Sequence, residues 1–296
     1  MLQQHGERVH KIALDAGLTC PNRDGTVAEG GCVYCNPATL APRAFDERLS
    51  IEEQLAIGTK RVGERHNARK FIAYYQINTN THAPVEALRS IYAPALASPE
   101  VVALAVSTRP DCLGDGVLDL LKEIRAEKDL WVELGLQSAN PSTLKLINRG
   151  HTPEDFAGAV TRLKTAGIEA CAHMIIGLPG EGRDFVLRTI EFLADLGVWG
   201  VKFHQMQVLK DTPLEAMYQD GKLKTLGLDE YAGLVIDCLE RISLDTVIHR
   251  LSGDVPRAFL VAPRWGANKF VVAERIISLM AERRTFQGAF YRRAYL

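Results

Sequence analysis

Three cysteines near the N-terminus are the residues whose type and spacing point most directly to chemistry. Eleven residues separate Cys20 from Cys32, two separate Cys32 from Cys35, and an aromatic residue, Tyr34, directly precedes the last cysteine. No fourth cysteine follows nearby. A four-iron iron–sulfur cluster is normally held by four thiolates. The set of three therefore predicts a cluster in which one iron is left open for a further ligand.

Zinc is the alternative metal for these thiolates. A structural zinc site closes with four Cys or His ligands, and His5 or His10 could supply the fourth. The spacing from His10 to Cys20 matches no common zinc pattern, and a glycine-rich spacer of eleven residues is unusual for one. We favour iron–sulfur over zinc, and the choice stays open at this point.

The bulk composition is that of an ordinary globular protein. The chain has 296 residues, of which 47% are hydrophobic and 24% charged. No apolar segment is long enough to span a bilayer, and the N-terminus lacks the apolar block of a signal peptide. We expect a cytoplasmic protein without membrane contact, in which cysteines serve metal or redox chemistry more often than disulfides. Three single cysteines are expected to be small buried residues: Cys112, Cys171 and Cys238.

The C-terminal region is basic although the net charge is only −1. From Arg241 to the end there are ten Lys or Arg residues against four Asp or Glu. Such a region is compatible with a polyanionic substrate such as RNA. A solvated surface that carries long cationic side chains explains the same charges equally well.

Short apolar segments alternate with helical patterns along the first two thirds of the chain. We predict strands over 9–14, 71–77, 101–106, 130–136, 170–176 and 201–208. Predicted helices cover 50–62, 116–126, 152–166 and 184–196. Ser50 with Glu53, and Thr152 with Asp155, have the spacing of capping boxes at two helix starts. The alternation predicts an α/β fold: a partial (β/α)6 TIM-type barrel of parallel strands, open on one side.

The pattern changes after residue 214. A helix is predicted over 228–242, a further strand-like segment over 246–251, a loop over 256–267 and a last helix over 268–282. We therefore predict a core domain, residues 1–214, that contains a cluster loop at 20–36. Residues 215–296 are predicted to form a C-terminal extension that packs on the barrel and contributes to substrate binding.

Polar side chains follow the predicted strands at the points where the strands end. Gln76 and Asn78 lie at the end of the second strand, and Glu133, Gly135 and Gln137 alternate on the fourth so that all three share one face. In a barrel of parallel strands, active sites are built at the carboxyl ends. A carboxylate that faces the interior is costly unless it has a binding partner. Glu133 and Gln137 are therefore site candidates, although a buried structural hydrogen bond would also explain them.

The cysteine string resembles that of the radical S-adenosylmethionine (SAM) superfamily. The commonest motif of that superfamily has three residues between the first two cysteines, but subgroups with longer spacers include the Elongator-type tRNA-modifying enzymes. The stretch 20–25 (CPNRDG) that leads to 31–35 (GCVYC) looks like the YhcC/YtqA-type radical SAM proteins. The resemblance covers essentially the whole chain.

The resemblance implies a mechanism and its cofactors. Cys20, Cys32 and Cys35 would hold a [4Fe-4S] cluster, and the amino and carboxylate groups of SAM would bind its fourth iron. The reduced cluster would cleave SAM to methionine and a 5′-deoxyadenosyl radical, which would abstract hydrogen from the substrate. A reducing electron donor such as flavodoxin or ferredoxin is implied as a partner. The protein must aim this chemistry and exclude water.

The resemblance also assigns roles to later residues. Tyr34 would pack near the adenine, and Gln76 with Asn78 would lie near the methionine amino group, although the Gly-Gly-Glu of many members is absent there. Glu133 and Gln137 would contact the ribose and amino group of SAM. Ordinary turn roles for Asn78 and its neighbours are an equal alternative.

Two further motifs complete the predicted SAM site. Arg149 resembles an arginine that pairs with the SAM carboxylate, a role that suits its planar fork. His173 and Gly177 match the motif on the adenine and ribose side. Weaker candidates on the sixth strand are His204, Gln205 and Gln207. A last set that could grip phosphates and stack a base comprises the segment Arg250–Asp254 with Arg257, Arg264, Trp265 and Lys269, although these residues could equally close the barrel.

The resemblance, together with the basic C-terminal region, implies a radical SAM enzyme that acts on tRNA, at the side chain of a wobble uridine. One alternative is a radical SAM enzyme that acts on a small molecule or a peptide. An alternative of another class is a non-catalytic metal-binding or RNA-binding protein. The open coordination position of the cluster argues against the last of these.

Overall fold

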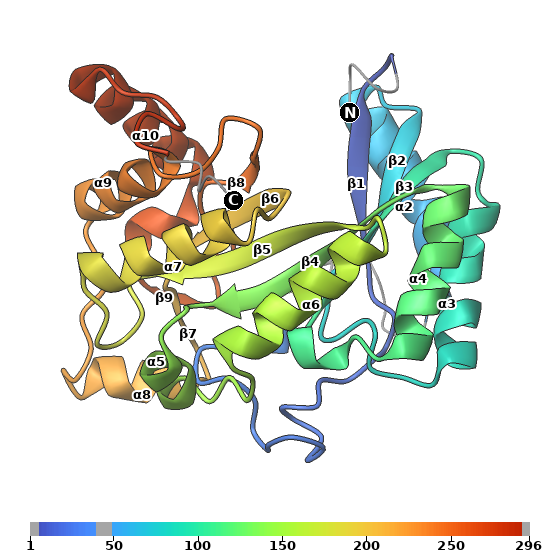
Figure 1. Cartoon of the computed structure of the whole chain (residues 1–296), viewed down its shortest axis with the longest axis horizontal. Helices are drawn as coiled ribbons and strands as arrows, with labels where there is room; N and C mark the ends of the chain where they lie inside the picture. The colour runs from blue at the N-terminus through green and yellow to red at the C-terminus, as the bar shows by residue number, and fades with distance from the viewer. Residues whose placement is uncertain (1–5, 40–48, 292–296) are drawn as a thin grey trace.

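A curved sheet of seven parallel strands forms the centre of the computed structural model, which describes residues 6–39 and 49–291. The strand order is β1-β2-β3-β4-β5-β6-β8. The strands are β1 (Val9–Leu14), β2 (Lys70–Tyr75), β3 (Val101–Thr108), β4 (Asp129–Gln137), β5 (Glu169–Ile176), β6 (Gly200–Gln205) and β8 (Val247–Arg250). Within the described residues β1 and β8 are the two ends of the sheet, so the predicted partial TIM-type barrel is confirmed (Figure 1).

Helices cover the outer face of the sheet and connect its strands. They are α2 (Ile51–His66), α3 (Val85–Ala97), α4 (Asp115–Glu127), α6 (Pro153–Thr165) and α7 (Arg183–Asp195). The main hydrophobic core lies between these helices and the sheet. Both predicted capping boxes are present, at Ser50 and at Thr152. None of the described helices has the length and apolar character that crossing a membrane requires.

The inner face of the sheet has an apolar floor. Ile72, Tyr74, Trp131 and Cys171 belong to a small buried cluster there. Polar and charged side chains from the carboxyl-terminal halves of the strands lie above this floor, as the barrel geometry predicts.

The chain after residue 200 differs from its prediction in two places and agrees with it in a third. The segment 201–208 is not one strand, because β6 ends at Gln205 and the short β7 (Val208–Leu209) follows. β7 pairs antiparallel with β9 (Leu260–Ala262), which lies inside the predicted loop. The strand-like segment near residue 250 is β8, which extends the parallel sheet.

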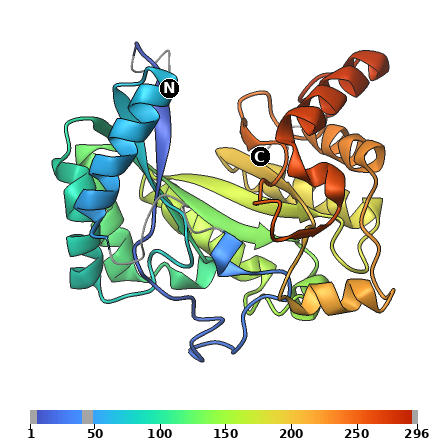
Figure 2. The same ribbon diagram turned by 180° about the vertical axis from the view of Figure 1, so that it is seen from behind.

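Three helices follow β7 or flank β8 and β9. They are α8 (Pro213–Gln219), α9 (Leu228–Leu239) and α10 (Lys269–Arg283). Figure 2 shows α9 and α10 at one end of the sheet and α2 with β1 at the other. The sequence did not predict α3, α8 or the short α5 (Pro141–Leu146). The division at residue 214 stays a prediction.

Candidate active site inside the barrel

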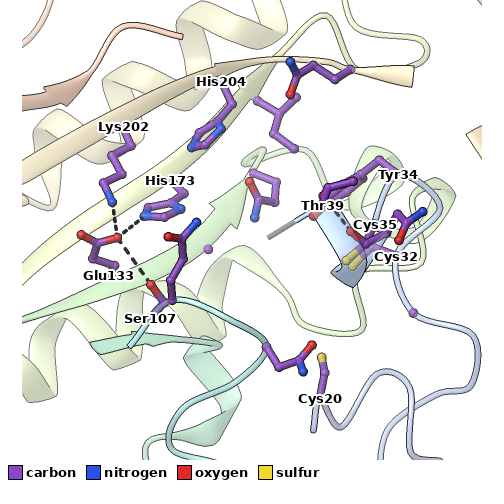
Figure 3. A pocket seen from close by; sticks show the side chains of 18 of the residues that line it. Cys20, Cys32, Tyr34, Cys35, Thr39, Ser107, Glu133, His173, Lys202 and His204 are labelled. Atoms are coloured by element: carbon purple, nitrogen blue, oxygen red, sulfur yellow. Dashed lines mark hydrogen bonds and ion pairs between the residues drawn. The ribbon is translucent and has the colours of Figure 1, made fainter. Parts of the chain in front are cut away.

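One cavity of about 260 Å³ opens at the carboxyl ends of the strands. Figure 3 shows it from close by. Its lining includes ten of the residues predicted from the sequence: Cys20, Cys32, Tyr34, Cys35, Gln76, Asn78, Glu133, Gln137, Arg149 and His173. These residues come from the cluster loop, from two strands and from strand-end loops, so the fold unites positions that are far apart in the chain.

The cluster loop follows β1 and bends back on itself. The backbone N–H of Arg23 donates to the Cys20 carbonyl at 2.8 Å, and that of Cys35 donates to the Cys32 carbonyl at 2.9 Å. Gly31 has φ of +82°, and a Cβ there would lie 2.8 Å from Nε of Arg23. A side chain at position 31 would therefore displace the arginine that supports the loop.

Cys32 is buried and has two hydrogen-bond donors at its sulfur. Nδ2 of Asn22 and Nη1 of Arg149 each lie 3.6 Å from Cys32 Sγ. Donors of this kind stabilise a thiolate that binds a metal and tune its electronic properties. Burial, together with the neighbouring Cys32, raises the pKa of Cys35 to about 11. Cys35 therefore keeps its proton at neutral pH unless a metal displaces it.

The described residues do not form a mononuclear zinc site. No group of three His, Cys, Asp or Glu side chains among them is arranged to hold one metal ion. A single zinc ion draws its thiolates together, because each Zn–S bond is only about 2.3 Å long. In a [4Fe-4S] cluster each thiolate binds a different iron, so the thiolates lie further apart. His10 stacks on His66 with ring centroids 4.4 Å apart and does not line the cavity. His5 lies outside the described residues.

Arg149 is the buried cation next to the cysteines. Nη2 donates to the Gly135 carbonyl at 2.8 Å, whereas Nε is buried without a hydrogen-bond partner. A buried N–H without a partner is costly, and a ligand carboxylate is its strongest acceptor. A Cβ at Gly135 would lie 2.5 Å from Nη2 of Arg149, so the strand leaves space for the guanidinium only because it has glycine there. The donor set fits the predicted cluster and a carboxylate-bearing ligand.

Arg109 holds the loop that carries Arg149, a role that the sequence did not reveal. Its side chain is only 2% exposed. Nη1 donates to the Arg149 carbonyl at 2.8 Å, and Nε and Nη2 bind both carboxylate oxygens of Asp111 at 3.0 and 2.8 Å. The only signal in the sequence is a polar run that follows the third strand.

Glu133 lies at the centre of a charged network below the cysteines. It accepts hydrogen bonds from Lys202, from Lys11 at 3.1 Å and from Trp131 at 3.2 Å. His173 Nε2 lies 3.0 Å from its Oε2. Burial alone would raise the pKa of Glu133, but Lys202 and the other partners hold it well below the usual range. Glu133 is thus an ionised carboxylate with partners inside the protein, and its contact with SAM stays a prediction.

The two histidines of this region are neutral. Burial, assisted by Lys202, lowers the pKa of His173 to about 4. Burial and Arg250 hold that of His204 well below its usual value. The two rings stack with centroids 5.5 Å apart. His173 has Glu133 as a partner, whereas Nε2 of His204 is buried without one.

The remaining predicted SAM contacts differ in position. Asn78 has φ of +58° and its amide donates to the Leu18 carbonyl at 2.8 Å, so it ties the end of β2 to the cluster loop. Gln137 also has positive φ, +75°, and lines the cavity. Gly177 does not line it. With φ of +92° it lies against Leu226, and its proximity to adenine stays a prediction.

Two members of the C-terminal set have partners within the protein. Trp265 donates its indole N–H to the Leu226 carbonyl at 3.0 Å and packs on Tyr231. Lys269 pairs with Asp254 at 3.5 Å. The predicted role of Trp265 in stacking a base therefore has no support in its position. Arg264 is exposed.

Comparison with known proteins places the chain in a class. The radical SAM superfamily matches residues 20–193, and the radical SAM C-terminal domain matches residues 198–282. The chain belongs to the radical SAM superfamily. It is a radical SAM enzyme, and the cofactors of this class are a [4Fe-4S] cluster and SAM, with a requirement for an electron donor. The non-catalytic alternative is therefore wrong.

Individual relatives agree with the predicted subgroup. The uncharacterized protein YtqA of Bacillus subtilis is 43% identical over 293 residues, which cover 99% of this chain and 91% of YtqA. A tRNA uridine(34) acetyltransferase of Methanocaldococcus infernus is 28% identical over 190 residues, 62% of this chain and 34% of that protein. The solved structure of Elp3 from M. infernus has the same fold, with a TM-score of 0.67 and 19% identity over 94% of this chain and 64% of that one.

Proposed function

We propose that this radical SAM enzyme modifies tRNA at the side chain of a wobble uridine, with Cys20, Cys32 and Cys35 as the ligands of the [4Fe-4S] cluster. The observation that carries the ligand assignment is that all three cysteines line one cavity with a buried arginine beside Cys32. The tRNA substrate is supported by the similarity to a tRNA uridine(34) acetyltransferase and by the basic C-terminal region.

The residues of the cavity prepare the site for its cofactors. When bound, the reduced cluster supplies the electron for reductive cleavage of SAM. Nε of Arg149 supplies the donor for the SAM carboxylate, because this atom is buried without a partner. Tyr34 lies between two cluster ligands and packs against the apolar cluster of Ile175 and Met206, which excludes water from this side.

The enzymatic half of the proposal is tested by anaerobic reconstitution with iron and sulfide. We expect the dithionite-reduced protein to form 5′-deoxyadenosine from SAM, and the Cys32→Ala variant to form none and to bind less iron. Cys238→Ala is the matched control, because Cys238 is buried in α9 away from the cavity. Equal product from Cys32→Ala and Cys238→Ala would remove Cys32 from the ligand set.

The tRNA half is tested by comparing modified nucleosides in tRNA from wild-type and deletion cells. We expect one wobble-uridine nucleoside to be lost and its precursor to accumulate. A plasmid with the wild-type gene should restore the nucleoside, and one with Cys32→Ala should not. An unchanged nucleoside profile would contradict the tRNA proposal and leave a small molecule or a peptide as the substrate.

A further inference from the structure

The wall of the cavity formed by β6, the residues that follow it and β8 carries buried polar atoms without hydrogen-bond partners. Nε2 of His204 and Nε2 of Gln207 are buried, and neither has a hydrogen-bond partner. The guanidinium of Arg250 makes no hydrogen bond or ion pair within the described residues. All three residues line the cavity. A wall that offers several unused donors requires a ligand that is rich in acceptors.

Positive charge is in excess at the same wall. Lys202 and Arg250 are register partners on neighbouring strands. Lys202 forms an ion pair with the carboxylate of Glu133, and Lys11 on β1 pairs with the same carboxylate. Burial lowers the pKa of Lys202 to about 8, so its ammonium stays charged at neutral pH. Two cations, Lys202 and Arg250, thus line this part of the cavity, and the carboxylate that Lys202 binds, Glu133, is already shared with Lys11 on β1.

The other acid that lines this part of the cavity does not compensate the excess. Asp254 pairs with Lys269 at 3.5 Å. Arg250 is only partly buried and has no ion-pair partner among the described residues, so its guanidinium is available to an anion that enters the cavity. Figure 3 shows Lys202, His173 and His204 on one side of the cavity and Cys32 and Cys35 on the other. A ligand held at the β6–β8 wall therefore lies across the cavity from the cysteines.

We propose that Arg250, Gln207 and His204, with Lys202 behind them, form a subsite for an anionic oxygen group of the substrate, a carboxylate or a phosphate. This inference rests on the proposed function, in which the cavity holds SAM and the reacting part of the substrate. The planar fork of Arg250 matches either group with two parallel hydrogen bonds. The amide of Gln207 and the N–H of His204, in its Nε2-protonated tautomer, complete the donor set.

The test measures, by calorimetry, the binding of two simple anions to the reconstituted enzyme in the presence of saturating SAM. Acetate represents a carboxylate and inorganic phosphate represents a phosphate. We expect one of them to bind saturably at one site per chain, and Arg250→Gln to weaken that binding about tenfold or more, the loss of a charge-assisted pair. Arg61→Gln, on the exposed face of α2, is the matched control and should bind as the wild type does.

The outcomes are separable. Two results would contradict the subsite. The first is that neither anion binds to the wild type with SAM present, which would mean that SAM itself uses these donors. The second is that Arg250→Gln binds the anion as the wild type does. Gln207→Leu, with an expected smaller loss, gives a second reading if Arg250→Gln fails to fold. Formation of 5′-deoxyadenosine by the wild type is measured separately, so failure of the proposed function is seen independently of anion binding.

Discussion

The guanidinium of Arg149 joins parts of the site that lie far apart in the chain. One nitrogen reaches the sulfur of Cys32 at 3.6 Å, a second donates to the Gly135 carbonyl at 2.8 Å, and Nε is left for a ligand. Lysine has the same charge but only a single ammonium group. A residue that must hold a cluster ligand, a strand end and a carboxylate at once is therefore arginine.

Replacing Arg149 with lysine should separate charge from geometry. We expect Arg149→Lys to weaken SAM binding about tenfold or more, because at least one charge-assisted hydrogen bond is lost. Equilibrium dialysis of the reconstituted protein with labelled SAM measures the affinity, and iron content shows whether the cluster is retained. SAM affinity equal to that of the wild type would show that Arg149 is not a SAM ligand.

Gly135 leaves the space that Arg149 occupies. A methyl group at this position would lie 2.5 Å from Nη2 of Arg149 and 2.8 Å from Nε2 of Gln137. We expect Gly135→Ala to lower the free energy of unfolding by about 1–3 kcal/mol, the usual cost of overpacking, and to weaken SAM binding as well. Chemical denaturation and dialysis measure the two effects.

A matched glycine lies in α6. A Cβ at Gly158 meets nothing within 4 Å, so Gly158→Ala should stabilise the protein by about 0.5–1 kcal/mol. If Gly135→Ala were as stable as Gly158→Ala, the crowding at the strand end would have no energetic consequence.

Glu133 should make stability depend on acid pH. Its folded pKa is held below the unfolded value, so its contribution is complete above the unfolded value of about 4.3 and is lost as pH falls through the lowered folded pKa. We expect Glu133→Gln to cost about 3–5 kcal/mol at pH 7, since it leaves Lys202 and Lys11 without a counter-charge. Its stability should also fall less steeply toward low pH than that of the wild type, which urea titrations at several pH values would show.

At the scale of elements, α6 begins directly after the loop that presents Arg149. Thr152 caps this helix, with its hydroxyl accepting from the Asp155 N–H at 3.1 Å and the Asp155 carboxylate accepting from the Thr152 N–H at 2.8 Å. The start of the helix thus fixes the end of the loop. A change in the cap should therefore alter the position of Arg149, three residues earlier in the chain.

Thr152→Ala should destabilise the protein by about 1 kcal/mol. The exposed Thr161→Ala in the same helix should change the unfolding free energy by less than about 0.5 kcal/mol. Thermal unfolding of the two variants makes the comparison. Equal stabilities of the two variants would show that the cap does not contribute to the stability of α6.

The sequence predicted the first six parallel strands and their amphipathic helices within a few residues, because apolar runs and capping residues bound them. It did not predict α3, whose pattern contains Pro94, or the pairing of β7 with β9. Strands of two and three residues carry no periodicity, and their pairing depends on tertiary contacts. The single segment 201–208 was split for the same reason.

The candidate site was predictable where side-chain type and local spacing carry the signal. The three cysteines were identified in this way, whereas Tyr34 and Arg149 came from the resemblance to the radical SAM superfamily; all five line the cavity. Lys202 was missed as a site residue because it stands alone in an apolar strand, and Arg109 because a polar run does not show which of its members supports the site. Arg250 was predicted only as part of the set that could grip phosphates, without its link to Lys202. Their relation appears only with the register of the sheet, in which Lys202 faces Arg250.

At the scale of the whole molecule, the core and the cluster loop are separate sources of stability. The main hydrophobic core lies between the sheet and its helices and contains none of the three cluster cysteines. We expect chelation of iron under anaerobic conditions to leave the far-UV circular dichroism of the protein unchanged. Loss of helical signal on chelation, absent when Cys32→Ala is treated in the same way, would show that the fold depends on the metal.

The carboxylate of Glu133 links strands near opposite ends of a sheet that does not close into a barrel. Lys11 belongs to β1 and Lys202 to β6, next to the other end of the sheet, and both reach this one carboxylate on β4. In a closed barrel a backbone ladder would join the first and last strands. Here a three-point tether through the interior takes over part of that task, so the charge of a single side chain helps to hold the two rims of the open sheet at a fixed separation.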